Sequence, residues 1–522
     1  MPESIAIRID GETLAAEPGI TLAAALESAG RPVLRRSIAG EPRGVLCAMG
    51  ICYECRVSID GQAHRRACME IVREGMEVRT GKRAFSFQPS AVSSQPEELD
   101  CDVAVVGGGP AGIAAACRAA ESDARTVLLD EGAEPGGQIH RHLPGREAPP
   151  AARAWLARLA RSGARVLLRT SVFDAARGSD GWRVLARAPE GSIAVRTRSI
   201  VVATGARELF LPFPGWTLPG VVGAGAAQAL WKSGASLRGR TAIVAGSGPL
   251  LLPVAASLAK AGARVALVAE QSGLLALGAF SAGLLRSPGK LREAVGYRRA
   301  FAATRYRTGA WVAEARGRGR VERVTVADAR GRRVEVDCDL AAVAYGLVPN
   351  TELARLLGCA VEGGAVTVGA SQETGVPGVF CAGEPCGVAG IDAAIAEGQI
   401  AGIAAAGRRP EDYWDARRIL RARARSRRFA ARLARGFRLR PELSRLAAPD
   451  TLVCRCEDVP RSRVEGCAGA REAKLSARAG MGACQGRVCG PGLRFLFGWE
   501  SDTVRSPVLP VPLGALAWEE DG

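Results

Sequence analysis

The chain is organised around residues 102–120, DVAVVGGGPAGIAAACRAA. Residues 103–106 form an apolar run typical of a buried parallel strand, and an apolar helix follows the glycines. Gly107 permits the tight turn out of the strand, Gly109 lets the backbone approach a pyrophosphate, and Gly112 allows close helix–strand packing. The start of the helix offers free N–H groups to phosphates. The stretch therefore predicts a dinucleotide-binding β–α unit.

A second strand and an acidic pair complete this unit. Residues 126–129 are apolar and end at Asp130 and Glu131, about 20 residues beyond the glycines, where an acid can hold the ribose hydroxyls. A glycine motif alone is weak support, and a glycine-rich turn without a ligand is the alternative. Strand, glycines, helix, strand and acid in this order favour the nucleotide. The predicted contacts are Gly107, Gly109, Pro110, Ala111, Gly112 and Glu131.

Length and composition set the class of protein. With 522 residues the chain is long enough for about three domains, and 48% hydrophobic residues suit buried cores. The formal net charge is +17, but the arginines are scattered along the chain rather than gathered with aromatic residues. This disfavours nucleic-acid binding, which needs a basic stripe on one face. A basic surface for an acidic protein partner stays open.

The expected location follows from what the sequence lacks. Residues 1–10, MPESIAIRID, have no signal-peptide pattern, and no run of about 20 apolar residues predicts a membrane span. Fifteen cysteines in such a chain indicate metal binding rather than disulfides. We therefore expect a cytoplasmic protein with no integral membrane segment.

Four cysteines near the N-terminus have the spacing of an iron–sulfur site. Cys47, Cys52, Cys55 and Cys68 form the pattern C-x4-C-x2-C-x12-C, with three cysteines in a loop of small residues. A close trio with a distant fourth is the plant-type arrangement for a [2Fe–2S] cluster. A structural zinc is the alternative, although zinc sites usually pair their cysteines in two knuckles. The segment resembles a β-grasp ferredoxin domain.

Three further motifs resemble the two-dinucleotide-fold flavoproteins of the glutathione and thioredoxin reductase superfamily. They are GGQ at 136–138, ATG at 203–205 and AGE at 382–384. The resemblance implies that the first nucleotide is FAD, although the last motif has glutamate where the superfamily has aspartate. No C-x-x-C lies between residues 102 and 380, which disfavours disulfide reductase activity. The implied FAD contacts are Gly137, Gln138, Thr204, Gly205, Gly383 and Glu384.

A second glycine motif predicts a nested nucleotide fold. Gly246-x-Gly248 follows an apolar run, and a later strand ends at Glu270, an acid that suits the free ribose of NAD rather than NADP. Leu251 replaces the third glycine and hinders close packing of helix on strand. A nucleotide fold that binds nothing productively is the alternative, and the sequence does not decide between the two.

A second cysteine quartet lies near the C-terminus. Cys454, Cys456, Cys484 and Cys489 form the pattern C-x-C…C-x4-C. The segment resembles the small bacterioferritin-associated ferredoxin domain, which implies another [2Fe–2S] cluster. The last two cysteines are further apart than in that family, and zinc is the main alternative.

The order of these motifs resembles the alpha subunits of heteromeric amine-oxidising flavoenzymes. That family includes opine oxidases, D-hydroxyproline dehydrogenase, hydrogen cyanide synthase and, more distantly, sarcosine oxidase. It implies an electron-transfer subunit with no catalytic residue of its own, because the amine is oxidised in a beta subunit resembling D-amino-acid oxidase. The resemblance is carried by GVLCAMGICYEC (44–55), VVGGGPAG (105–112), PGGQI (135–139), LPFPGW (211–216), AGSGPLLLPVA (245–255), GLVPNTEL (346–353), FCAGEP (380–385), CRCEDV (454–459) and CQGRVCG (484–490).

The expected protein is a multidomain α/β flavoprotein with FAD and two [2Fe–2S] clusters, and NAD(H) or FMN is the further cofactor left open. An NAD(P)H-dependent reductase and a scaffold without a redox-active flavin are the alternative functions. The predicted domains are a ferredoxin-like domain (1–82), a linker (83–100), an FAD-binding domain (101–234 and 338–410), a nested nucleotide domain (235–337), a basic helical connector (411–447) and a ferredoxin-like helical domain with a tail (448–522).

Overall fold

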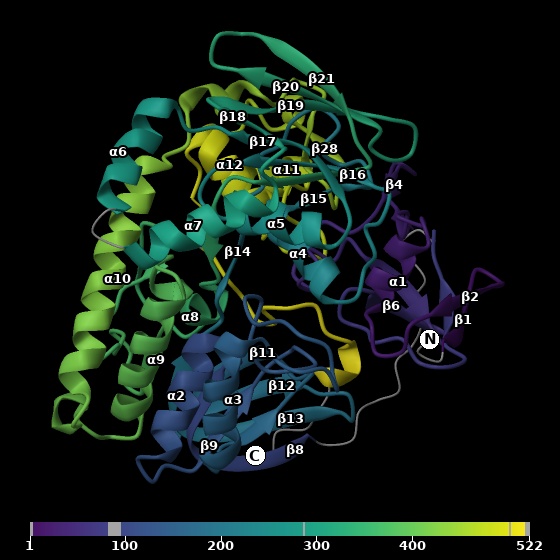
Figure 1. Cartoon of the computed structure of the whole chain (residues 1–522). Coiled ribbons are helices and arrows are strands. Elements are labelled where there is room, and N and C mark those ends of the chain that lie inside the picture. Colours follow the sequence, from purple (N-terminus) through teal and green to yellow (C-terminus); the bar gives the residue numbers. More distant parts are fainter. Residues whose placement is uncertain (1–3, 82–95, 285–287, 501–502, 517–522) are drawn as a thin grey trace. The chain divides into compact units, whose positions relative to one another are not determined.

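The computed structural model of the protein describes residues 4–81, 96–284, 288–500 and 503–516, coloured along the chain in Figure 1. The chain divides into two compact units, each made of three stretches of sequence. The first unit contains Met1–Gln88, Glu208–Gly346 and Arg432–Ser501, and the second contains Pro89–Arg207, Leu347–Ala431 and Asp502–Gly522. Most of the predicted linker, residues 83–95, lies outside the described residues.

The N-terminal part of the first unit is a five-stranded sheet with the strand order β2-β1-β7-β5-β6. Ile7 and Ile9 alternate with polar residues and are fully buried, and Asp10 and Gly11 adopt the positive φ angles that a tight hairpin requires. The side chain of Thr21 caps the one helix of this sheet. The elements are β1 (Ile5–Ile9), β2 (Glu12–Ala16), α1 (Leu22–Ser28), β3 (Arg35–Arg36), β4 (Pro42–Arg43), β5 (Arg56–Ile59), β6 (Gln62–Arg66) and β7 (Glu77–Arg79).

The middle part of the first unit is a five-stranded parallel sheet, β15-β22-β16-β17-β18, next to a three-stranded antiparallel sheet, β19-β20-β21. Runs of Val, Ile and Ala form the parallel strands because both faces of the sheet are buried. The elements are β15 (Val221–Gly223), α4 (Ala224–Lys232), β16 (Thr241–Gly246), α5 (Leu251–Lys260), β17 (Arg264–Glu270), α6 (Leu274–Leu284), α7 (Pro288–Ala300), β18 (Arg305–Thr308), β19 (Ala310–Arg316), β20 (Arg323–Asp328), β21 (Arg333–Asp337) and β22 (Leu340–Ala344).

The C-terminal part of the first unit is built from short elements around the second cysteine quartet. One buried apolar cluster includes Leu46 of the N-terminal part, Trp216 and Ala245 of the middle part, and Val453 and Val488 of the C-terminal part. The three parts therefore share a single core. The elements are η3 (Pro441–Arg445), β27 (Leu452–Cys454), β28 (Val459–Pro460), η4 (Arg461–Arg463), α11 (Ala470–Ala477) and α12 (Cys489–Phe497).

The second unit is a seven-stranded sheet whose strands β10, β9, β8, β13 and β26 pair in parallel. Helices α2 and α9 pack side by side in this unit (Figure 1). The elements are β8 (Glu97–Val106), α2 (Pro110–Ala120), β9 (Thr126–Leu129), α3 (Pro150–Arg161), β10 (Arg165–Leu167), β11 (Ser171–Gly178), β12 (Gly181–Arg187), β13 (Ser192–Val202), β14 (Ala206–Glu208), β23 (Leu347–Pro349), α8 (Glu352–Leu356), β24 (Val361–Glu362), β25 (Ala365–Val366), β26 (Val379–Cys381), η1 (Glu384–Cys386), α9 (Ile391–Ala405), η2 (Pro410–Asp412), α10 (Ala416–Gly436) and η5 (Leu513–Ala515).

Two glycines set the distance between α2 and α9. A Cβ atom on Gly398 would lie 2.0 Å from the carbonyl oxygen of Ala111, and one on Gly402 would lie 2.2 Å from that of Ala115. Only glycine permits this approach, because any side chain would collide with backbone of α2. The close contact fixes the start of α2 beneath the glycine turn.

The ends of several elements differ from the prediction. Strand β8 begins at Glu97 because residues 97–101 pair in register with β13, so the strand includes the last residues of the predicted linker. The chain passes from the second unit to the first after Arg207, earlier than the predicted boundary at 234. The reason is that β15 pairs with β22, which places residues 221–223 in the nested sheet. Among the described residues, no helix has the length and apolar character to cross a membrane.

Candidate functional site

The first glycine turn makes close backbone contacts at the carboxyl ends of the parallel strands. Gly107 has a φ of +109°, and a Cβ atom there would lie 2.4 Å from the carbonyl oxygen of Ala203. A Cβ atom on Gly112 would lie 1.7 Å from the carbonyl oxygen of Gly107. Gly137 packs on Gly109, since its Cβ would lie 2.9 Å from the Cα of that residue. The loop at 136–138 therefore lies against the turn, as the superfamily resemblance implies.

Two adjacent acids, Asp130 and Glu131, follow β9, and Asp130 forms hydrogen bonds with this turn. The carboxylate of Asp130 accepts hydrogen bonds from the N–H groups of Gly108 and Gly132, and burial raises its pKa. Glu131, the acid chosen from the sequence, instead contacts the hydroxyl of Ser171 at 3.4 Å. The hydrogen bonds of Asp130 with this turn make it a further candidate for the acid of the nucleotide site. The sequence offers a signal for this residue, because Asp130 comes directly after Leu129, the last residue of β9.

The ATG turn after β13 forms hydrogen bonds with Asn350, which lies much later in the chain. The Thr204 hydroxyl donates to the carbonyl oxygen of Asn350 at 2.7 Å, and the Asn350 side-chain amide donates back to the carbonyl oxygen of Thr204 at 2.8 Å. The Asn350 N–H donates to the carbonyl oxygen of Gly205. Thr204 also lies beside the glycine turn, because its nitrogen is 3.3 Å from the Cβ position of Gly107.

Glu384 provides a test of whether a flavin suits this site. Gly383 has a φ of +81° and packs against Ala111, which brings the AGE motif to the start of α2. One carboxylate oxygen of Glu384 accepts from the N–H of Gly390, while the other is buried and has no donor among the described residues. A buried acceptor needs a partner, and a hydroxyl of a flavin's ribityl chain would supply the missing donor. The residues therefore fit a flavin.

The four N-terminal cysteines are all buried and lie in two pairs. Cys47 contacts Cys52, and Cys55 contacts Cys68. Burial raises the pKa of Cys47, but the Cys52 thiol and the backbone N–H groups of Met49 and Cys52 outweigh it and lower that pKa to about 6. Thiolates that accept backbone N–H groups suit a cluster with four cysteine ligands.

The C-terminal cysteines repeat this arrangement. Cys454 contacts Cys489, and the sulfur atoms of Cys456 and Cys484 are 3.5 Å apart. In the part of the chain that the structure describes, no three His, Cys, Asp or Glu side chains converge on one metal ion. Two pairs of cysteines are a ligand set that a binuclear iron–sulfur cluster could use, with two protein ligands for each iron.

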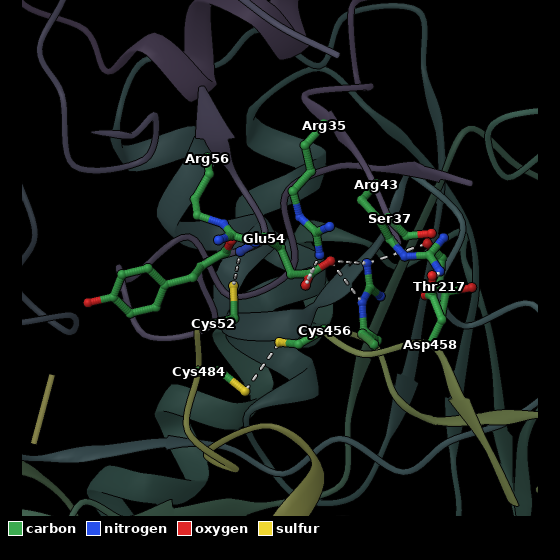
Figure 2. Close-up of polar contacts among 12 residues, drawn as sticks. Arg35, Ser37, Arg43, Cys52, Glu54, Arg56, Thr217, Cys456, Asp458 and Cys484 are labelled. Carbon is green, nitrogen blue, oxygen red and sulfur yellow. Dashed lines mark hydrogen bonds and ion pairs between the residues drawn. The ribbon is translucent and has the colours of Figure 1, made fainter. Parts of the chain in front are cut away.

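A buried ion network lies next to cysteines of both quartets (Figure 2). Glu54 accepts hydrogen bonds from Arg35 at 2.7 Å and from Arg455 at 3.2 Å, and the side chains of Glu54 and Arg455 are each only 1% exposed. Burial would raise the pKa of Glu54, but the two guanidinium groups lower it to about 2. A second ion pair joins Arg43 to Asp458 at 2.7 Å.

This network was not predicted from the sequence. Its signal was a charged residue inside each cysteine motif, Glu54 in CYEC and Arg455 in CRC. Charges next to buried ligands must themselves be paired, because an isolated buried charge is costly.

The second glycine turn resembles the first in its local geometry. Gly246 has a φ of +141°, and its Cβ would lie 1.6 Å from the carbonyl oxygen of Ala344. Glu270 is fully buried and accepts from the N–H groups of Gly248 and Ser272 at 2.8 and 2.7 Å. The three predicted residues Gly246, Gly248 and Glu270 thus come together, as expected for a dinucleotide fold.

Residues 437–440, which we call the cover segment, lie against this second turn. The Ser247 hydroxyl donates to the carbonyl oxygen of Phe437 at 3.1 Å. The fully buried side chain of Gln271 donates to the carbonyl oxygen of Arg438 and accepts from the N–H of Arg440. The cover segment therefore lies beside the carboxyl ends of β16 and β17, the edge at which a nucleotide binds in such folds.

Comparison with known proteins identifies the family. Residues 101–398 match the family pyridine nucleotide-disulphide oxidoreductase, and residues 2–83 match the 2Fe-2S iron-sulfur cluster binding domain. An opine oxidase subunit of Rhizobium meliloti (strain 1021) is 33% identical over 472 residues, which cover 80% of this chain and 98% of the relative. The chain belongs to the opine oxidase family.

Further relatives agree with this family. Hydrogen cyanide synthase subunit HcnB of Pseudomonas aeruginosa is 33% identical over 461 residues, covering 79% of this chain and 97% of the relative. Subunit HcnA of the same organism is 40% identical over 79 residues, covering 15% of this chain and 76% of the relative. These relatives are named as subunits of larger enzymes.

A solved structure shares the fold of this member of the opine oxidase family. L-proline dehydrogenase from P. horikoshii superposes with a TM-score of 0.72 at 20% identity, covering 99% of this chain and 98% of that chain. The comparisons confirm the predicted fold class and an oxidoreductase that uses a flavin and an iron–sulfur cluster.

Proposed function

We propose that this chain is the electron-transfer subunit of a heteromeric amine or imino-acid dehydrogenase of the opine, hydroxyproline or glycine type. The observation that carries the proposal is that two buried cysteine quartets, each arranged as two pairs, share one core in the first unit. Such an arrangement moves electrons rather than transforming a substrate. Two similar relatives, HcnB and the opine oxidase subunit of Rhizobium meliloti, support the amine class.

We assign FAD to the edge of the second unit and a [2Fe–2S] cluster to each quartet. A flavin accepts electrons in pairs and releases them singly, and a [2Fe–2S] cluster carries one. The residues of this chain hold the flavin, keep the thiolates away from water and supply backbone N–H groups to their sulfur atoms. We add Asp130 to the predicted contacts, and Glu131 and Gln138 stay predictions. The other flavin contacts would be Gly107, Gly109, Pro110, Ala111, Gly112, Gly137, Thr204, Gly205, Gly383 and Glu384.

The amine would be oxidised in a partner subunit that resembles D-amino-acid oxidase. We assign no catalytic residue to this chain. HcnA and HcnB are separate subunits, whereas this chain carries a segment similar to each, so we infer that it fuses an iron–sulfur subunit to a flavin subunit. Because its thiols must stay reduced before the clusters form, we place the assembly in the cytoplasm.

The two alternative functions receive less support. An NAD(P)H-dependent reductase would need an open second nucleotide site, but the cover segment contacts Ser247 and Gln271 at that site. A scaffold without a flavin would leave the buried oxygen of Glu384 unsatisfied.

The test is turnover with and without the partner. The purified chain should contain a flavin and iron but should not oxidise an opine, hydroxyproline or glycine by itself. Adding a D-amino-acid-oxidase-like subunit from the same source should produce amine-dependent dye reduction. Cys47→Ser and Cys489→Ser should each lower the iron content and this combined activity. Amine turnover by the isolated chain, or a preparation without flavin, would refute the proposal.

A further inference from the structure

We propose that Glu54 and Arg455 are positioning residues whose buried ion pair holds the two cysteine quartets next to each other, so that electrons are exchanged directly between them. The inference rests on the proposed function, because it requires a cluster at each quartet. Each exchange moves one electron from a reduced cluster to an oxidised one. No bond is made or broken, and no proton is transferred, because Glu54 and Arg455 stay charged throughout.

Both members of the pair lie inside cysteine motifs. Glu54 lies between Cys52 and Cys55, and Arg455 lies between Cys454 and Cys456. The side chains of Glu54 and Arg455 meet at 3.2 Å. The nearest cysteines of each quartet are only one or two residues away along the chain, at ~3.8 Å per residue. The distance between the two quartets is therefore limited to about the combined length of the two side chains plus these short stretches of backbone. The side chains of Cys52 and Cys456 both lie near Glu54 (Figure 2).

Further contacts fix the geometry of the pair. The Arg455 guanidinium also donates to the carbonyl oxygen of Trp216 at 2.8 Å, and it lies 5.1 Å from the centre of the Trp216 ring. The Trp216 indole N–H donates to the carbonyl oxygen of Leu452 at 2.7 Å. Arg455 is thus held by both Trp216 and Glu54, and its planar guanidinium fork leaves Glu54 little freedom to move.

The pair is costly to bury. Moving two charges out of water costs several kcal/mol, and well-packed apolar residues often stabilise a core as well or better. Stability alone therefore gives little reason for an ion pair at this place. A charged pair with directional hydrogen bonds does something that apolar residues do not, because it fixes the relative position of the two segments that carry it.

The charges of the network do not cancel. Three buried guanidinium groups, on Arg35, Arg43 and Arg455, face two carboxylates, on Glu54 and Asp458. The guanidinium groups therefore outnumber the carboxylates near Cys52 and Cys456, and Arg56 adds to this excess. Two clusters with four thiolate ligands each would supply the compensating negative charge, so the network suits two loaded quartets rather than two sets of neutral thiols.

The experiment compares magnetic coupling between the two reduced clusters. Glu54→Gln and Arg455→Met remove the pair, and Arg478→Met is the matched control because it breaks the neighbouring but exposed ion pair with Glu457. Cys489→Ser defines the signal of one cluster alone. Iron and labile sulfide per chain are measured first, followed by electron paramagnetic resonance of the dithionite-reduced protein.

We expect the unchanged protein to show spin–spin broadening and fast relaxation that Cys489→Ser lacks. Glu54→Gln and Arg455→Met should keep their iron but lose this coupling, while Arg478→Met should retain it. Coupling that survives in both pair variants would overturn the inference, as would two clusters without coupling in the unchanged protein. If Arg455→Met loses iron, Arg455→Lys tests the same point: the shorter charged group should keep the iron and weaken the coupling, and full coupling there would refute the role. Absence of clusters in the unchanged protein would instead refute the proposed function.

Discussion

Asp130 and Glu131 are neighbours in the sequence but have different contacts. Asp130 bonds the N–H groups of Gly108 and Gly132 and so shapes the glycine turn. We expect Asp130→Ala to lose these bonds and to weaken flavin binding about 10- to 100-fold, because each buried bond to a charged group contributes about 1.5–3 kcal/mol. Glu131→Ala, the matched control, should retain the flavin. The flavin-to-protein absorbance ratio after desalting measures the difference, and a larger loss in Glu131→Ala would contradict this assignment.

Glu208 is a buried carboxyl group that gives the protein a pH-dependent stability. Burial raises its pKa to about 7 from 4.5, although the N–H groups of Gly225 and Ala226 oppose the shift. Between these two values the folded protein holds a proton that the unfolded chain releases, so the free energy of unfolding falls as pH rises from 4.5 to 7. The loss is on the order of 3 kcal/mol and remains above pH 7. Negative charge at Cys47 acts in the same direction.

Glu208→Gln should remove this dependence, since an amide does not titrate. We expect the variant to match the unchanged protein near pH 5 and to exceed it in stability near pH 8. Urea unfolding at the two pH values measures this, with the Cys47→Ser protein as a check on the influence of the quartet. Parallel pH profiles for Glu208→Gln and the unchanged protein would show that Glu208 is not the group responsible.

At the scale of single elements, the contact between α2 and α9 depends on glycine. Gly398→Ala would place a Cβ atom 2.0 Å from the backbone oxygen of Ala111, and backbone cannot move as a flexible side chain can. We expect a loss of about 1–3 kcal/mol of stability and weaker flavin binding, because the start of α2 must shift. Gly296→Ala on α7 is the control: no atom lies within 4 Å of its Cβ position, so it should be neutral or stabilising by up to about 1 kcal/mol. Equal thermal stability of both variants would contradict this account.

The cover segment is the element that decides how the second nucleotide fold behaves. Its backbone forms hydrogen bonds with Ser247 and Gln271, at the edge of the sheet where NADH would bind. We expect NADH, added without oxygen, to leave the flavin absorbance unchanged, while dithionite bleaches it. Stopped-flow spectroscopy measures both, and isothermal titration with NAD⁺ should give no binding heat. Rapid bleaching by NADH would show that the segment does not close the site.

At the scale of the whole molecule, the two units have separate cores. The quartets both lie in the first unit, and the edge that we propose for the flavin lies in the second. We expect Cys47→Ser to lower the melting temperature of the first unit, because a core ligand site is lost, while flavin release on heating stays at the same temperature. Scanning calorimetry and flavin fluorescence follow the two events. A variant in which the two shift together would show that the units unfold as one.

The sequence allowed much of the site to be predicted where the chemistry is local. Turn geometry requires glycine at 107 and 112, and cluster ligation requires cysteine at fixed spacing, so both are visible in a few adjacent residues. The choice between Asp130 and Glu131 was not visible in this way. Successive side chains of a strand point to opposite faces of the sheet. Which of the two acids contacts the turn therefore depends on the register of β9 in the sheet.

The sequence by itself determined the fold class, the family and the eight candidate cysteine ligands, because these follow from local backbone demands and from motif order. Only the tertiary structure decided which residues that are distant in the sequence come into contact. Glu54 and Arg455 are far apart in the sequence and meet in one buried ion pair, and residues 437–440 return to cover a turn near Ser247. Such contacts are set by how buried surfaces pack and how buried charges find partners, and no local pattern records either.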